Sequence, residues 1–489
     1  MKRVSGIVVT LTLAGPLASG RAQAPVPIAR FVDAASEDRR TSEPALQTIQ
    51  AEWRNGYAGL LIELARFMRA PRQARPVDIA ASASAADAGG AGRAGEPISP
   101  LGDPGSPARR RLLQFLEQRT GQKFGDDLDR WRAWLWRSPY EPHPDFAALK
   151  RVVYSQLDPR LGAFFPDGVR ALIRLDEIDW GGVRVNGIPP LRQPRYVAAN
   201  HASFMKDSNV VFGLFVNGEA RAYPRRILAW HELALDRLGG VDLAIVYCTL
   251  CGTVMPYEST AGGRSFHFGT SGLLYQSNKL MFDEETNSLW STFEGKPVVG
   301  ALAGTSLSLR TRPVVTTTWK AWKTAHPETT VLSLDTGYNR DYSEGAAYRD
   351  YFASDQLMFQ VSRTDRRLAL KDEVLVMRLP GGSGGTLPVA IDVRLLKKHA
   401  VYAFSSGERH YVVVSDQSGA NRVFAVADAW PKQANAARIV DARGRRWRLT
   451  EDALVPEGTT AGEFAPRVSA QRAFWFGWFA QFPDTLLLE

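Results

Sequence analysis

The sequence predicts an α+β protein, with an N-terminal α-helical region followed by a duplicated, strand-rich α+β unit. Three observations support this fold class. Apolar residues recur at three- and four-residue spacing in about the first 170 residues, which is the period of amphipathic helices. After about residue 175 the apolar runs become short and are bounded by Gly, Asn and Pro, as strands are. The third observation is a tryptophan motif that occurs twice in the strand-rich part.

The composition is that of a globular protein. The chain has 489 residues, of which 45% are hydrophobic, 23% charged and 10% aromatic. At roughly 150 residues per domain this predicts about three domains, and it excludes a disordered chain, a collagen and a coiled coil. Two cysteines exclude a disulfide-stapled scaffold. The net charge is +9, but the Arg residues are scattered without an aromatic-interleaved basic stripe, so we expect no nucleic-acid partner.

Residues 1–24 have the pattern of a secretory signal peptide. Two basic residues precede an apolar stretch at 6–17, and small residues follow. Ala22-Gln23-Ala24 fits the small-x-small cleavage pattern, and cleavage after Gly20 is the alternative. We therefore expect a periplasmic or secreted protein with no stable membrane span after signal cleavage. An uncleaved anchor is the alternative. Export implies that Cys248 and Cys251 lie in an oxidising compartment unless a metal or an active reductant holds them.

Helices are expected in two segments before residue 170. The helical segment at 25–70 contains one helix, and the helical region at 110–170 contains three. Residues 71–109 between them are rich in Ala, Gly, Pro and Ser with few large apolar side chains, which indicates a flexible linker. The expected helices are Ala45–Met68, Arg110–Gln118, Leu128–Trp136 and Phe146–Gln156.

The second part is expected to consist mainly of strands. Short apolar runs predict them at Val210–Val216, Leu243–Tyr247, Lys279–Phe282, Leu307–Leu309, Val374–Met377 and Tyr411–Val414. Two helices are expected to interrupt these strands, at Pro224–Leu238 and Thr317–Ala325. Proline is well placed in the first turn of a helix, where its missing N–H costs nothing.

An internal repeat divides the strand-rich part. Trp319-x-x-Trp322-x4-Pro327-Glu328-Thr329 recurs with identical spacing as Trp475-x-x-Trp478-x4-Pro483-Asp484-Thr485. We therefore expect one copy over 187–335 and a second copy over 336–489. The first copy is longer, and the surplus falls across the stretch that holds both cysteines. The second copy has Ser415-Asp416-Gln417-Ser418-Gly419 there, which favours chemistry in the first copy.

Cys248 and Cys251 form a Cys-x-x-Cys-Gly turn directly after a predicted strand. Gly252 and the proline that follows at 256 argue against a helix opening at the second cysteine, and a thioredoxin-type site needs that helix. The turn is instead typical of a metal knuckle, in which two thiolates converge on one ion. His231 and His267 are the candidates for completing the site, and zinc or copper suits such soft ligands.

Several alternatives to a metal site remain open. The same cysteines fit a redox-active or structural disulfide, or a thiol–disulfide oxidoreductase that cycles the pair. A non-catalytic binding scaffold would need neither cysteine. A hydrolase using Asp283 and Ser271 is a further alternative, although Gly272 directly follows the serine and the Gly-x-Ser-x-Gly pattern is not met. The residues alone assign no catalytic group, no substrate and no enzymatic activity.

A set of motifs in the second part resembles one known family. The motifs are Gly218–Pro224, Ile227–Glu232, Tyr247–Thr253, Phe268–Tyr275, Leu289–Ser291, Asp335–Tyr342 and Phe474–Trp478. On these residues the chain is similar, over about 187–489, to the exported bacterial and archaeal proteins that carry domain of unknown function 3179 (DUF3179). This sequence has Thr249 where that family usually has Pro between the cysteines. The resemblance implies export and assigns no reaction.

Overall fold

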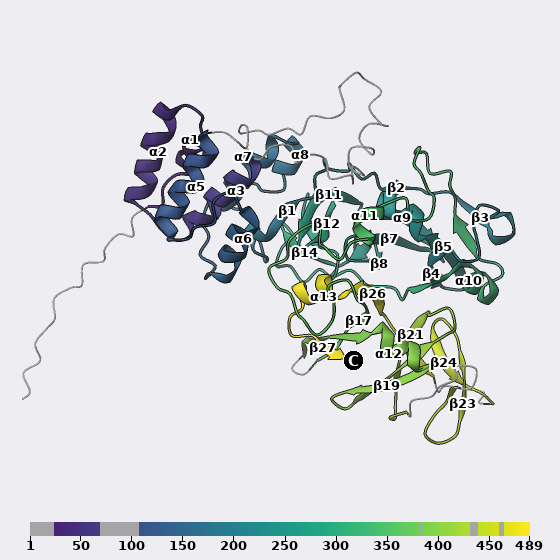
Figure 1. The fold of residues 1–489 in the computed structure, drawn as a ribbon. Helices are drawn as coiled ribbons and strands as arrows, with labels where there is room; N and C mark the ends of the chain where they lie inside the picture. The colour runs from purple at the N-terminus through teal and green to yellow at the C-terminus, as the bar shows by residue number, and fades with distance from the viewer. Residues whose placement is uncertain (1–23, 69–106, 382–383, 431–438, 459–463) are drawn as a thin grey trace, which may run out of the picture.

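The computed structural model describes residues 24–68, 107–381, 384–430, 439–458 and 464–489. It is an α+β protein in which a helical region lies beside a strand-rich body (Figure 1). The predicted signal peptide and almost all of the predicted linker lie outside the described residues. Across the described ranges, no helix has the length and apolar character needed to cross a lipid bilayer.

The helical region is close to its prediction. It consists of α1 (Ile28–Ala34), α2 (Arg39–Ala51), α3 (Tyr57–Phe67), α5 (Pro107–Thr120), α6 (Leu128–Arg137), α7 (Phe146–Ser155) and α8 (Pro159–Gly162). Helices α5, α6 and α7 confirm three predictions to within a few residues. The prediction of one helix over Ala45–Met68 is wrong, because α2 ends and α3 begins inside it. The break contains Gly56, where the carbonyl oxygen of Glu141 lies 2.0 Å from the place a Cβ would take and leaves no room for a side chain.

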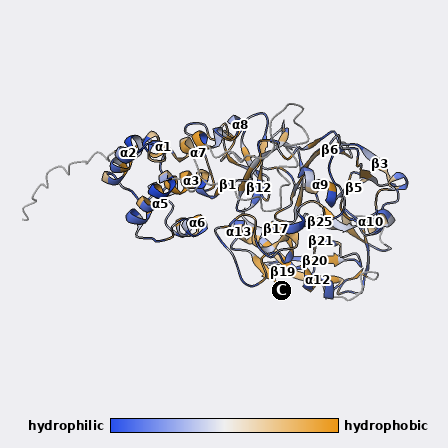
Figure 2. Cartoon of the chain, turned by 45° about the horizontal axis from the view of Figure 1, so that its top comes forward, coloured by the Kyte–Doolittle hydropathy of each residue, from blue (hydrophilic) through white to orange (hydrophobic). Residues whose placement is uncertain are grey.

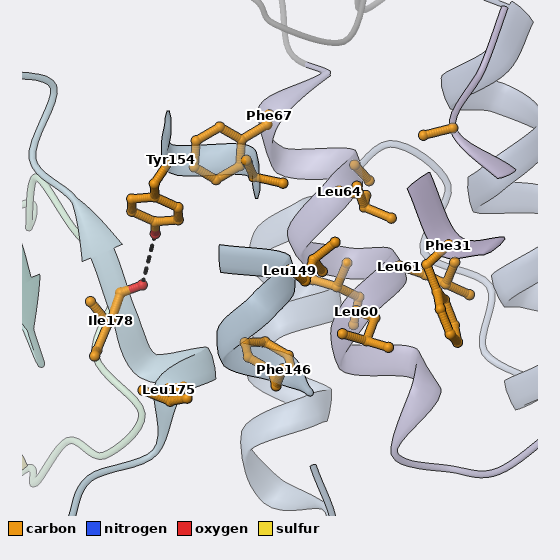
Figure 3. Packing of buried hydrophobic residues seen from close by; sticks show 14 of the residues in the cluster. Phe31, Leu60, Leu61, Leu64, Phe67, Phe146, Leu149, Tyr154, Leu175 and Ile178 are labelled. Carbon is orange, nitrogen blue, oxygen red and sulfur yellow. Dashed lines mark hydrogen bonds between the residues drawn. The ribbon is translucent and has the colours of Figure 1, made fainter. Parts of the chain in front are cut away.

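Helix α3 is the centre of the helical core. Leu60, Leu61 and Leu64 are buried on it and pack with Phe146 and Leu149 of α7 (Figure 3). The outer helices α2 and α5 carry long hydrophilic stretches (Figure 2). The apolar stripes that the sequence shows at helical spacing therefore face this core.

Buried ion pairs join the helices of the helical region to one another and to the first strand, β1 (Ile178–Trp180). Lys150 Nζ lies 2.7 Å from Glu63 Oε1, and Arg132 donates to Asp179 Oδ2 over 2.7 Å. All four side chains are nearly inaccessible to solvent. Because removing one partner would leave an uncompensated buried charge, these pairs fix the helices on the strand.

The strand-rich body begins with a short 3₁₀ turn, η1 (Leu175–Glu177), ahead of β1. Its first half consists of β2 (Leu191–Arg192), β3 (Tyr196–Ala198), η2 (Ala199–His201), β4 (Val210–Val216), β5 (Glu219–Pro224), α9 (Arg225–His231), β6 (Leu233–Leu238), β7 (Val241–Cys248), β8 (Thr253–Glu258), β9 (Thr260–Ala261), β10 (Arg264–Ser265), β11 (Phe268–Tyr275), β12 (Asn278–Asp283), β13 (Leu289–Ser291), β14 (Lys296–Val299), β15 (Val315–Thr318), α10 (Trp319–Ala325) and β16 (Thr330–Leu332).

The second half follows a segment that contains the short helix α11 (Arg349–Phe352). It consists of β17 (Glu373–Pro380), β18 (Thr386–Asp392), α12 (Val393–Lys398), β19 (Val401–Ser406), β20 (Arg409–Ser415), β21 (Asn421–Val426), β22 (Ile439–Val440), β23 (Arg446–Leu449), β24 (Ala453–Pro456), β25 (Ala465–Val468), β26 (Gln471–Phe474), α13 (Trp475–Gln481) and β27 (Leu486–Leu488).

The two halves share one pattern of strand pairing. The first half contains the order β15-β4-β5-β16, and the second contains β26-β17-β18-β27. In each, the last strand is parallel to its neighbour and the other pairs are antiparallel. A meander follows in each half, β6-β7-β8 in the first and β19-β20-β21 in the second. This shared order is what a duplication of one unit would produce.

Most strand predictions are confirmed, and two elements differ. The run Leu307–Leu309 is not a strand, since Leu309 makes one backbone bond, to Gly295, instead of a ladder. The predicted helix over Pro224–Leu238 is correct only as far as His231. Glu232 then takes a left-handed conformation with φ 57°, and the chain continues as β6, paired with β7.

Candidate functional site

The two cysteines lie at the end of a β-hairpin in the first half of the strand-rich body. Strand β7 ends at Cys248, whose cross-strand partner is Thr253, the first residue of β8. The intervening turn closes with a bond from the Gly252 N–H to the Thr249 carbonyl over 3.2 Å. No helix begins at Cys251, as the sequence predicts, and Gly252 supplies the left-handed φ of 60° that the turn requires.

Both thiols are free, buried and in contact with each other. Cys248 is 2% exposed and Cys251 is fully buried. Burial by itself raises the pKa of Cys248, but hydrogen bonds from the Cys251 side chain and from the backbone N–H groups of Lys279 and Cys251 bring that pKa below its usual value. Cys248 is therefore the sulfur that the fold prepares as a thiolate.

Cys251 has the opposite character. Burial, followed by the hydrogen bond and the negative charge of Cys248, raises the pKa of Cys251 well above its usual value. The Asn278 amide donates to Cys251 Sγ over 3.4 Å, and this sulfur lies 3.5 Å from the Ser277 carbonyl oxygen. Loss of a proton is therefore easier at Cys248 than at Cys251.

Elements from the second half and from the connecting segment cover the cysteine turn. The Phe474 N–H donates to the Cys251 carbonyl over 2.8 Å. Gly477 of α13 comes so close that a Cβ on it would lie 2.9 Å from Cys251 Sγ. On the other side, Tyr351 of α11 donates its hydroxyl to the Leu250 carbonyl over 2.7 Å. The helix α13 lies against the first half in Figure 1, close to β14.

A buried ion pair between Glu232 and Lys279 borders the two cysteines, and the sequence alone did not predict it. Glu232 and Lys279 are 7% and 4% exposed, and Lys279 Nζ lies 3.2 Å from Glu232 Oε2. The Tyr348 hydroxyl donates to the other carboxylate oxygen over 3.0 Å. The charge of Glu232 acts to raise the pKa of both thiols. The ammonium of Lys279 compensates that charge, and the backbone N–H of Lys279 donates a hydrogen bond to Cys248.

The two candidate histidines do not join the cysteines. His231 uses both ring nitrogens elsewhere, Nδ1 with the Pro189 carbonyl at 2.9 Å and Nε2 with the Tyr342 hydroxyl at 2.5 Å. Burial lowers its pKa to about 4, so the ring is neutral. His267 has a side chain that is 70% exposed and pairs with Glu285. Across the described parts of the chain, no three His, Cys, Asp or Glu residues gather in a way that would hold a metal ion.

Ser271 and Asp283, the candidate residues for a hydrolase, make hydrogen bonds to other parts of the fold. The Ser271 hydroxyl donates to the Leu280 carbonyl over 2.5 Å and accepts from the Leu273 N–H. Asp283 accepts from the Trp290 indole over 2.8 Å and from the N–H of Thr286 over 2.6 Å. Both side chains are fully buried, so their polar atoms stabilise the β11–β12 region.

Three hydroxyls beside the cysteines have no partner. Thr249, Thr253 and Ser277 are at most 1% exposed, and none of their hydroxyl oxygens makes a hydrogen bond within the described residues. Thr249 follows Cys248 in the chain, Thr253 is opposite it in the hairpin, and the Ser277 carbonyl faces Cys251. Buried hydroxyls are normally bonded, so these three near the cysteine turn are exceptions.

Comparison with known proteins identifies a family for this part of the chain. A family model described as protein of unknown function (DUF3179) matches residues 185–485, which include both halves of the strand-rich body and the complete cysteine site. No curated protein and no solved structure matches the chain.

Proposed function

This chain belongs to the DUF3179 family, whose function is unknown, and we propose that its Cys248–Cys251 pair is a reversible dithiol–disulfide centre in an exported protein. The observation that carries the proposal is the contact between two free thiols at the end of one β-hairpin. They are in contact, the pKa of Cys248 is lowered and the pKa of Cys251 is raised. A thiolate beside a protonated thiol is the arrangement that a dithiol pair needs to react in two steps.

The chemistry follows from those two states. With a low-molecular-weight disulfide RSSR, the Cys248 thiolate attacks one sulfur, the S–S bond breaks, and RS⁻ leaves and takes a proton from water. Cys251 then loses its proton to water and attacks Cys248 Sγ, which releases the second RS⁻. The protein gains one disulfide, and the two electrons of the pair reduce RSSR to two thiols.

The cysteine turn supports this role in a second way. The thiols of Cys248 and Cys251 are already in hydrogen-bond contact, so closing the S–S bond requires only local movement. The pair is buried, however, so it is protected from large partners and reacts with molecules that can enter the protein. Reactive cysteines of thiol–disulfide oxidoreductases are usually partly exposed, and this pair differs in that respect.

The test is an equilibrium between the full-length protein and dithiothreitol buffers of increasing oxidised fraction. Alkylation and mass measurement then report the thiols that remain. We expect a reversible two-electron transition in the wild type and none in Cys248→Ala or Cys251→Ala. Ser415→Ala, at the end of the corresponding strand β20, is the matched control and should titrate like the wild type. Two thiols that stay reduced in every buffer would overturn the proposal.

A soft metal ion is the second candidate, and the backbone donors favour it. N–H groups of Lys279 and Cys251 point at Cys248, as they do at thiolate ligands in metal knuckles. Cys248 and Cys251 would hold the ion, and two thiolates suit copper(I). His231 and His267, proposed from the sequence as further ligands to zinc or copper, bond to other groups. We therefore place the metal second.

Metal content separates the two candidates. Protein purified without a His tag is assayed for zinc and copper, and its free thiols are counted. About one equivalent of metal that is absent from Cys248→Ser/Cys251→Ser protein would favour the metal site. Metal-free protein that interconverts between two thiols and none would favour the redox centre.

A further inference from the structure

We infer that the oxidant of the cysteine pair is a small peroxide, with the Thr253 hydroxyl as the group that positions it. This inference rests on the proposed dithiol function and names its substrate class. Three observations at the site lead to it: the burial of both sulfurs, the position of Thr253 opposite Cys248, and the unpartnered hydroxyls around the pair.

Burial limits the size of the oxidant. Cys248 is 2% exposed and Cys251 is fully buried. Phe474 and Gly477 pack on one side of the turn, and Tyr351 covers the other. In-line attack on a disulfide needs the substrate sulfurs aligned with Cys248 Sγ, and this cover hinders that alignment more for glutathione disulfide or a protein disulfide than for a molecule of two or three heavy atoms.

Unpartnered hydrogen-bond donors select an oxygen-bearing molecule. Residues directly opposite in an antiparallel pair place their side chains on the same face, so the Thr253 side chain is next to that of Cys248. Its hydroxyl has no partner, and neither do those of Thr249 and Ser277. A peroxide oxygen accepts such donors, which stabilise the negative charge that develops on the leaving oxygen.

The electron balance closes within the site. The Cys248 thiolate attacks one oxygen of ROOH, the O–O bond breaks, and the leaving RO⁻ takes a proton from water. Cys248 is now a sulfenic acid, Cys–SOH. Cys251 attacks this sulfur, its thiol proton and the sulfenic OH leave as water, and the disulfide forms. One peroxide has gained two electrons, and two molecules of a small thiol restore the pair as RSSR forms.

The charges of Glu232 and Lys279 are compatible with a neutral substrate. Their charges compensate each other at 3.2 Å, so the site around Cys248 has no excess positive charge that would favour an anionic substrate. A neutral peroxide is the class that such a balanced, buried site admits most readily. The Asn278 amide, 3.4 Å from Cys251 Sγ, helps to hold the second sulfur for its attack.

The experiment follows disulfide formation in the reduced full-length protein after mixing with hydrogen peroxide or, separately, glutathione disulfide. Tryptophan fluorescence reports the rate, and alkylation with mass measurement confirms the product. We expect hydrogen peroxide to react at least about tenfold faster at equal concentration. Thr253→Val keeps the shape and removes the hydroxyl, and we expect it to slow the peroxide reaction about tenfold or more. Thr253→Ser should restore the rate.

Controls keep the two proposals separable. The Thr253 variants are also titrated in the dithiothreitol buffers, so that each peroxide rate is compared at a known dithiol equilibrium. Ser277→Ala is the second variant if Thr253→Val fails to fold. A faster reaction with glutathione disulfide, or an unchanged peroxide rate in Thr253→Val, would overturn this inference while the dithiol function stands. Failure to form a disulfide with any oxidant, dithiothreitol buffers included, would overturn both.

Discussion

The β7–β8 turn and the β20–β21 turn occupy corresponding places in two similarly paired units, and they are stabilised in different ways. In the β20–β21 turn, Asp416 Oδ1 accepts from the N–H of Ser418 over 2.9 Å, from the N–H of Ala420 over 3.1 Å and from the Ser418 hydroxyl over 2.5 Å. In the cysteine turn, Thr249 and Thr253 leave their hydroxyls without partners. The β20–β21 turn uses its polar groups in internal hydrogen bonds, whereas the cysteine turn leaves two hydroxyls unbonded.

Each turn is also covered by the opposite half of the body. The cysteine turn packs under α13, where the backbone of Phe474 bonds to Cys251. The β20–β21 turn reaches β15, where the hydroxyls of Thr317 and Ser418 lie 2.7 Å apart. Within the tryptophan motif, α13 has Gly477 where α10 has Ala321. The smaller residue makes room for a sulfur atom.

The largest effect that the comparison predicts is at Gly477. A side chain there would begin 2.9 Å from Cys251 Sγ. Because overpacking a well-packed contact costs up to about 3 kcal/mol, we expect Gly477→Val to lower the free energy of unfolding by that order and to displace Cys251. Denaturant unfolding measures the loss, and Ala321→Val on α10 is the matched variant with the smaller expected cost. If the two variants lost equal free energy of unfolding, the contact between Gly477 and Cys251 Sγ would not be the cause of the loss.

Acid sensitivity of the first half is the next effect. The pKa of His231 is lowered from 6.5 to about 4 by burial, so the folded protein binds the proton less readily than the unfolded chain. Stability contributed by the neutral ring is complete above about pH 6.5 and decreases as the pH falls toward 4. At pH ~5 the expected loss is about 2 kcal/mol.

Unfolding measured between neutral pH and pH ~5 checks this effect in His231→Gln, whose side chain does not titrate. We expect the variant to lose less stability over that interval than the wild type does. His399, which ends α12 in the second half, gives the matched variant His399→Gln, expected to follow the wild-type profile. If His231→Gln follows it too, the acid sensitivity has another origin.

The smallest predicted effect is at Asp416. Asp416→Ala removes the acceptor of three hydrogen bonds in the β20–β21 turn and of a fourth, from the Arg422 guanidinium over 3.2 Å. Each bond contributes about 1 kcal/mol or less where water can replace it. We expect a fall of about 1–2 kcal/mol in the free energy of unfolding and an unchanged dithiol equilibrium. A changed equilibrium would show that the two turns are coupled, against the division of roles described above.

Local patterns predicted most of the fold. Apolar spacing identified α5, α6 and α7, and the run Val210–Val216 coincides with β4. The predicted helix through Leu238 failed because its second half, Leu-Ala-Leu-Asp-Arg-Leu, pairs with β7 in space. Periodicity in one segment cannot decide between helix and strand when a distant partner strand determines the outcome.

The candidate site was predicted in part. Cys248 and Cys251 were identified from their spacing, but nearness in sequence was a poor guide to their neighbours. His231 is next to Glu232 in the chain, yet Glu232 borders the thiols while the imidazole turns toward Pro189. The role of Gly477 depends on contacts between the two halves, which the repeat alone does not specify. Its difference from Ala321 in the aligned motifs was the available signal.

The asymmetry of the two thiols is the central claim, and thiol ionisation tests it most directly. Ultraviolet absorbance of the thiolate is recorded against pH in the reduced wild type, Cys248→Ala and Cys251→Ala, and it requires no reagent to enter the site. We predict two separate ionisations in the wild type, the first below the ordinary pKa of a thiol and absent from Cys248→Ala. Two thiols that ionise together at or above the ordinary value would contradict it.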